Sequence, residues 1–123
     1  MTGNVKGYRD LEVWQKAMGL VVDIYKVTHV FPKNEMYGIV SQMQRSAVSI
    51  PANIAEGKGR QSLKEFLQFL SVANGSLTEL ETYVLIAEQL GYVTLQEKET
   101  LINKTDEIAR MIKGLQKSLQ LKL

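Results

Sequence analysis

Apolar residues recur at alternating steps of three and four along almost the whole chain, and this spacing restricts the fold more than any other feature. Such steps place side chains on one side of an α-helix, whereas a half-buried strand requires alternation. Only two prolines, Pro32 and Pro51, occur in 123 residues. The periodic runs cover roughly residues 10–29, 35–57, 63–90 and 95–119. We therefore expect one all-α domain over residues 1–123, a left-handed antiparallel up-down-up-down four-helix bundle.

Local signals mark the ends of these helices. Asp10 is expected to cap the first helix, and capping boxes that begin at Ser62 and Thr94 open the third and fourth. Gly91 is expected to end the third helix, because glycine tolerates the left-handed backbone found there. The apolar pattern of the second helix continues beyond Pro51, so we expect a bend at that proline and not a helix end.

The first helix has two apolar stripes, which is more than one packing partner requires. The first stripe consists of Leu11, Trp14, Met18, Val21, Tyr25 and Thr28, and the second stripe consists of Val13, Ala17, Leu20, Ile24, Val27 and Phe31. Together they cover about 200° of the helix surface. One interpretation is that this helix contacts two neighbours in its own bundle. The other is an oligomer interface formed by the second stripe, through Val13, Leu20, Ile24, Val27 and Phe31.

A polar stripe lies beside the apolar one on the second helix. It consists of Gln42, Ser46, Ser49, Asn53, Glu56 and Arg60, and residues 74–79 of the third helix, which include Ser76 and Glu79, are similarly small and polar. Small side chains allow two helix backbones to approach closely, and their polar groups then complete one another's hydrogen bonds. The sequence favours an internal contact between these helices; a functional pocket and a solvated face are the alternatives.

Residue types that carry catalysis or bind metals are scarce. The chain has no cysteine and one histidine, His29, which excludes thiolate chemistry and a histidine-based metal cluster. Glu56 and Glu79 are a conceivable carboxylate pair, but no nucleophile or phosphate-binding loop accompanies them. We expect no enzyme, no catalytic residue, no metal and no cofactor. No apolar run has the length of a membrane span or a signal peptide, so we expect a cytoplasmic protein without a membrane partner.

The small net charge of +2 conceals an uneven distribution. Residues 1–64 have nine basic and five acidic side chains, residues 65–99 have one and six, and residues 100–123 have five and two. Two groups of cations are candidates for phosphate contact, with a merely solvated surface as the alternative. The first group is Arg110, Lys113 and Lys117 on the fourth helix, and the second is Arg45, Lys58 and Arg60 on and after the second helix.

Several segments together resemble a known family. The most specific is QRSAVSIPANIAEG at residues 44–57, followed by Gly59 and Arg60; residues 8–17, 31–38, 73–82 and 90–92 also match in order and spacing. They resemble the four-helix-bundle proteins encoded in 23S ribosomal RNA intervening sequences. The resemblance implies a compact antiparallel bundle without known catalysis, and relatives of this fold assemble as ring-like homopentamers.

The resemblance also implies partners. Genes of this family can lie inside ribosomal RNA genes, which suggests association with RNA. A related bundle family is the accessory variability determinant of diversity-generating retroelements, which partners a reverse transcriptase and binds nucleic acid. We therefore expect a non-enzymatic homo-oligomeric binding module that associates with RNA or with a nucleic-acid-processing enzyme. The alternatives are a retroelement accessory protein that binds a reverse transcriptase, or a protein-interaction scaffold without affinity for RNA or DNA.

Overall fold

Four long helices make up most of the computed structural model, which describes residues 7–123. They are α1 (Glu12–Thr28), α2 (Ser41–Lys58), α3 (Leu63–Gln89) and α4 (Leu95–Gln120). Short 3₁₀ turns at Tyr8–Asp10 and Lys33–Glu35 and a π-helical segment at Met36–Val40 complete the secondary structure. Within these described residues there is no strand, so the all-α prediction is confirmed.

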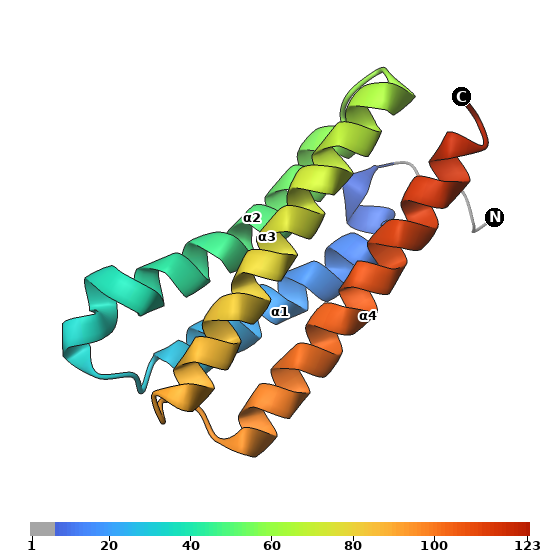
Figure 1. Cartoon of the computed structure of the whole chain (residues 1–123). Coiled ribbons are helices and arrows are strands. Elements are labelled where there is room, and N and C mark those ends of the chain that lie inside the picture. The colour runs from blue at the N-terminus through green and yellow to red at the C-terminus, as the bar shows by residue number, and fades with distance from the viewer. Residues whose placement is uncertain (1–6) are drawn as a thin grey trace.

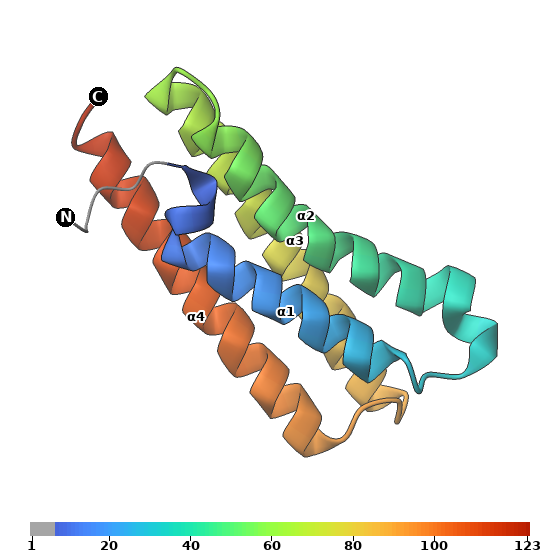
Figure 2. The same cartoon turned by 180° about the vertical axis from the view of Figure 1, so that it is seen from behind.

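The helices form a bundle in which each contacts the next along the chain and α4 closes back onto α1. Consecutive helices run in opposite directions, as Figures 1 and 2 show from the two sides of the molecule. In Figure 1, α3 lies in front of α1, and in Figure 2 α1 lies in front, so these two helices occupy opposite sides. The left-handed sense of the packing stays a prediction.

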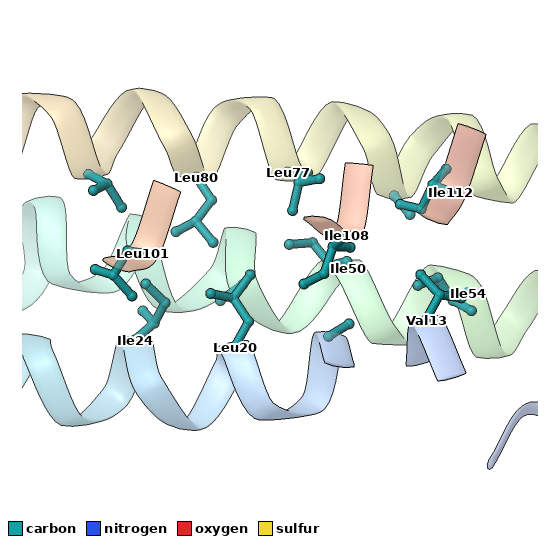
Figure 3. Packing of buried hydrophobic residues seen from close by; sticks show 14 of the residues in the cluster. Val13, Leu20, Ile24, Ile50, Ile54, Leu77, Leu80, Leu101, Ile108 and Ile112 are labelled. Carbon is teal, nitrogen blue, oxygen red and sulfur yellow. The ribbon is translucent and has the colours of Figure 1, made fainter. Parts of the chain in front are cut away.

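All four helices contribute to one hydrophobic core. Figure 3 shows apolar side chains pointing into the space between the helices, among them Val13, Leu20, Ile24, Ile50, Ile54, Leu77, Leu80, Leu101, Ile108 and Ile112. These side chains are almost completely buried. Burying one side chain of this size stabilises the folded state by about 1.5–3 kcal/mol, so this core is the main source of stability.

The second stripe of the first helix belongs to this core, and its assignment to an oligomer interface is wrong. Val13, Leu20, Ile24 and Phe31 are buried within the single chain, and Val27 is half-buried against the same cluster. Residues with no exposed surface have nothing to offer a second copy. The exposed apolar positions of α1 lie elsewhere, at Met18, Val22 and Tyr25. Both stripes are apolar, and the inner one is formed by the side chains that fit between the other three helices.

The caps agree with the sequence at three of the four predicted positions. Thr94 and Glu97 form a complete capping box, and the Ser62 hydroxyl accepts a hydrogen bond from the backbone N–H of Glu65. Gly91 has a positive φ of 79° and follows the end of α3, as expected of a residue in the left-handed region. The prediction for Asp10 is wrong, because it ends a 3₁₀ turn and Leu11 occupies the N-cap position of α1.

The second helix begins later than predicted but continues as predicted through Pro51. Residues 36–40 form a π-helical segment that contains a kink at Gly38 (φ −110°, ψ −115°), and the regular helix starts at Ser41. Met36, which lies in the first turn of the predicted helix, is exposed. The helix passes Pro51, which is buried, and ends at Lys58.

Glu35, which precedes the kinked segment, contacts the α3–α4 connection at the same end of the bundle. The Tyr92 hydroxyl donates a hydrogen bond of 2.7 Å to Glu35 Oε2, and its ring centroid lies 5.2 Å from that of Phe31. The Glu35 carboxylate, which accepts this hydrogen bond, raises the pKa of Tyr92. The connection between α3 and α4 therefore holds the turn between α1 and α2 in place. None of the helices in residues 7–123 combines the length and apolar character needed to cross a membrane.

Candidate nucleic-acid interface

The three cations of the fourth helix share one exposed face. Arg110, Lys113 and Lys117 are exposed on α4, and Ile108 and Ile112 are buried on its other side. Steps of three and four keep the cations within about 60° of one another around the helix. Among residues 7–123, no salt bridge or hydrogen bond engages their side chains. They are therefore free to contact phosphates.

The second group of cations does not form one cluster. Arg45 lies 13 residues before Lys58 on α2, a separation of about 20 Å along the helix axis. Arg60 is already engaged within the chain: it lies 2.8 Å from Glu56 Oε2 and its guanidinium carbon lies 5.0 Å from the centroid of the Phe69 ring. Lys58 is half-buried. Of this group, only Arg45 is both exposed and free of an ion pair in the described residues.

The fold converts the uneven charge distribution of the sequence into a difference between the two ends of the bundle. The half that contains the α2–α3 connection and the end of α4 (residues 7–20, 50–75 and 108–123) has nine basic and four acidic side chains. The other half (residues 21–49 and 76–107) has five basic and nine acidic side chains. The cations of α4 thus belong to a wider positive region, which we call the basic end.

The polar stripe of α2 forms an internal contact with α3. Ser46 Oγ lies 2.8 Å from Glu79 Oε1, and Ser49 Oγ lies 2.8 Å from Ser76 Oγ. Asn53 Nδ2 donates to both the carbonyl oxygen and the hydroxyl of Ser49, at 2.8 and 2.9 Å. This pair of helices also has the most extensive contact in the bundle. The residues predicted to hold the two helices together are therefore brought together.

Other members of the predicted stripe make no hydrogen bond to α3 in the described residues, and one of them is Asn53, whose two hydrogen bonds both go to Ser49 of its own helix. Gln42 is exposed and takes part through its backbone carbonyl, which accepts a hydrogen bond of 2.8 Å from Ser46 Oγ. Glu56 pairs with Arg60 on its own side of the contact. Because Glu79 contacts Ser46, it lies ten residues along α2 from Glu56, or about 15 Å. Glu56 and Glu79 thus form no carboxylate pair.

Gly57 lies where α2 and α3 approach each other closely. A Cβ atom at this position would lie 2.7 Å from Phe69 Cβ and 2.9 Å from Phe66 Cδ1. Real Cβ contacts are essentially never that short, so any side chain would push the two helices apart. Gly57 therefore has a packing role inside α2, which continues to Lys58.

A second polar contact, between α3 and α4, was not predicted from the sequence. Thr105 is completely buried, and its hydroxyl donates a hydrogen bond of 2.6 Å to Glu81 Oε2. Burial raises the pKa of Glu81 above its usual value; Asp106 raises it further by hydrogen bonding and by charge, whereas the Thr105 hydrogen bond lowers it. Thr105 occupies the position between Leu101 and Ile108 in the apolar pattern of α4. A polar residue at an otherwise apolar position was the one sequence feature that could have indicated this contact.

An open groove separates α1 from α4. Two adjoining hollows of about 480 and 350 Å³ share Asp23 and Lys104, and Val27, Leu101 and Leu20 form part of their floor. Ion pairs cross the groove: Lys104 Nζ contacts Asp23 Oδ2, and Lys16 Nζ lies 3.4 Å from Glu107 Oε2. In the described residues no group of three or more histidine, aspartate or glutamate side chains is arranged to hold a metal ion.

A family model for the 23S rRNA-intervening sequence protein matches residues 9–114. The chain belongs to this family. The motifs at residues 8–92 predict this family, and the matched region continues beyond them into α4. A comparison with curated proteins found no match.

The fold of this family member is similar to a solved structure. That structure is a 1.70 Å crystal structure of a protein of unknown function from the S23 ribosomal protein family of Bacteroides thetaiotaomicron. The two chains are 25% identical over an alignment that covers 85% of this chain and 95% of the other, with a TM-score of 0.79.

Proposed function

We propose that this protein is a non-enzymatic homo-oligomeric module that binds RNA or another nucleic acid through the basic end of its bundle. The observation that carries the proposal is the set of three exposed α4 cations, Arg110, Lys113 and Lys117, which have no ion-pair partner in residues 7–123. Membership in a family named for an intervening sequence of 23S rRNA supports RNA as the ligand. No aromatic side chain interrupts the cation positions, so contact with phosphates is favoured over base stacking.

Assembly makes this modest charge effective. One copy offers three free cations on α4, and a homo-oligomer repeats them on every copy, which raises the affinity for a long polyanion through multivalency. The expected assembly is the homopentameric ring that the family resemblance implies. Binding is expected to tolerate changes of base sequence and to weaken between about 50 and 200 mM salt, because each phosphate contact releases counterions.

Charge reversal at the three positions tests the proposal. The triple variant Arg110→Glu, Lys113→Glu and Lys117→Glu is expected to weaken binding to structured RNA and to reduce the slope of log Kobs against log salt by about three. The matched control is Lys33→Glu, Lys98→Glu and Lys104→Glu, which changes the net charge equally at the acidic end. Fluorescence anisotropy measures binding, and circular dichroism checks the helix content of both variants.

Two outcomes contradict the proposal. If the α4 variant binds with unchanged affinity and salt slope, this face does not contact nucleic acid. If the unmodified protein binds none of structured RNA, single-stranded RNA and duplex DNA at low salt, the module does not bind nucleic acid, and a protein-interaction scaffold becomes the better hypothesis.

A further inference from the structure

We propose that the copies of the homo-oligomer pack side by side, with α1 of one copy against α3 of the next. This inference rests on the homo-oligomer proposed above and names its interface. The first surface, the α1 face, consists of Met18, Val22, Tyr25 and His29. The second surface, the α3 face, consists of Val72, Gly75, Glu79, Thr82 and Ile86. Both sets have steps of three and four, the spacing that two helices need to interlock.

The α1 face exposes large apolar side chains that do not belong to the core of the single bundle. Met18, Val22 and Tyr25 are 42–50% exposed, whereas the neighbouring Leu20 and Ile24 are buried. A hollow of about 400 Å³ lies beside Tyr25, between α1 and α2, and Val48 of α2 lines it. The apolar surface therefore extends over the junction of two helices.

The α3 face combines exposed apolar residues with a glycine that the single chain does not explain. Val72 and Ile86 are 52% and 41% exposed. Gly75 lies between them, and a Cβ atom there would have no neighbour within 4 Å. Glycine in the interior of an exposed helix is less stable than alanine by about 1 kcal/mol. At Gly57 close packing within the chain accounts for this loss, whereas at Gly75 no contact within the chain does so, and the space above it is open to a second molecule.

The two faces lie at the same height on opposite sides of the bundle. Gln44 of α2 donates a hydrogen bond to Thr28 of α1, and two residues further along, Ser46 contacts Glu79 of α3. Because α2 and α3 are antiparallel, two residues back along α2, from Ser46 to Gln44, correspond to two residues forward along α3, from Glu79 to residue 81. Thr28, which contacts Gln44, therefore lies level with residue 81. Because α1 and α3 run in the same direction with the same rise per residue, Val22 lies level with Gly75.

Equal height is one condition for a ring of side-by-side copies, because a difference in height would produce a helical filament. A rotation about an axis parallel to the bundle leaves heights unchanged, so it brings the α1 face of one copy to the α3 face of its neighbour in register. Val22 then lies opposite the space left by Gly75, and Tyr25 lies opposite Thr78 and Glu79. A large residue on one helix thus meets a small one on the other.

Charge complements the apolar fit. Lys26 and Arg45 flank the α1 face, are exposed, and have no ion-pair partner within residues 7–123. The α3 face contains Glu79, and the one cation of α3, Lys64, is at the other end of that helix. A second copy therefore offers an opposite charge to each side. Opposite charges across an interface select the partner and set its register.

The decisive experiment uses the fact that the two surfaces differ. Val22→Asp is expected to disable the α1 face and Gly75→Trp the α3 face, and each variant alone is expected to be a monomer near 13.9 kDa by light scattering. Each variant retains one intact surface, so an equimolar mixture is expected to form a dimer and nothing larger. A symmetric interface, in which each surface pairs with itself, does not produce this result.

Controls separate this inference from the proposal on which it rests. Gly114→Trp makes the same change on α4, where a Cβ atom also has no neighbour within 4 Å, and is expected to leave the mass unchanged. Thermal unfolding checks that each variant is folded, and Met18→Glu and Thr82→Trp replace any variant that is not. An unmodified protein that is monomeric at micromolar concentration overturns the homo-oligomer itself. An oligomer that survives both Val22→Asp and Gly75→Trp, or a mixture that stays monomeric, overturns only the assigned interface.

Discussion

The α2–α3 and α1–α4 contacts join neighbouring helices around the same core but differ in the side chains beside it. Between α2 and α3 the flanking residues are short: Ser49 bonds to Ser76, and Gly57 allows the backbones to approach. Between α1 and α4 they are long and charged, and the Lys104–Asp23 pair crosses an open groove. Small polar residues thus allow two helix backbones to approach closely, whereas ion pairs between long side chains connect two helices that remain separated by a groove.

The largest effect is expected from a single methyl group in the closed contact. Gly57→Ala should lower the free energy of unfolding by about 2 kcal/mol, because the added Cβ overlaps Phe69 and overpacking outweighs the gain in helix propensity. Urea denaturation measures the change. Gly114→Ala is the control on the open surface of α4 and should raise stability by up to about 1 kcal/mol. Equal effects at the two glycines would show that α2 and α3 are not in close contact.

A smaller effect is expected from the hydroxyl pair of the same contact. Ser49→Ala and Ser76→Ala should each lower the free energy of unfolding by about 1 kcal/mol, since each leaves a half-buried polar group without its partner. The double variant should be less destabilised than the sum, with a coupling of about 0.5 kcal/mol or more. Strict additivity would mean that the two hydroxyls do not interact in solution.

The smallest effect is expected across the open groove. Asp23→Asn and Lys104→Gln should each change the free energy of unfolding by only a few tenths of a kcal/mol, because the ion pair is substantially exposed. The difference should shrink further in 0.5 M salt, which screens exposed charges. If these variants lost as much free energy of unfolding as Ser49→Ala, and salt did not reduce the loss, the α1–α4 contact would be as tightly packed as the α2–α3 contact.

Periodicity, caps and motifs predicted the four helices because these features act locally. The same features do not decide which of two apolar stripes faces inward. On α1, Leu20 and Ile24 fill the core while Met18 and Tyr25 remain exposed, and that choice depends on the shapes of three other helices. The prediction of an interface at Leu20 was wrong for this reason. The contact of Tyr92 with Glu35, just before the kinked segment, is likewise a long-range feature that local periodicity does not reveal.

The candidate site was predicted only in part for a related reason. Residues a few positions apart on one helix, such as Arg110 and Lys113, share a face whatever the tertiary structure is. Ser46 and Glu79 are 33 positions apart, and their contact was expected because both stripes were visibly small and polar. The pairing of Thr105 with Glu81 was not expected, since one threonine within an apolar pattern gives no indication of its partner.

The separation of charge between the two ends also gives the molecule a permanent electric dipole moment directed along its longest axis. The longest helix, α3, has 27 residues and spans about 40 Å, so the centres of the net positive half and the net negative half lie about 20 Å apart. In the field of a polyanion such a dipole experiences a torque that turns the basic end forward before any contact forms, and this orientation increases the fraction of productive collisions. Side-by-side copies related by rotation have parallel moments that add. The proposed ring would then have a positive and a negative rim, and we expect nucleic acid to approach it from the positive side.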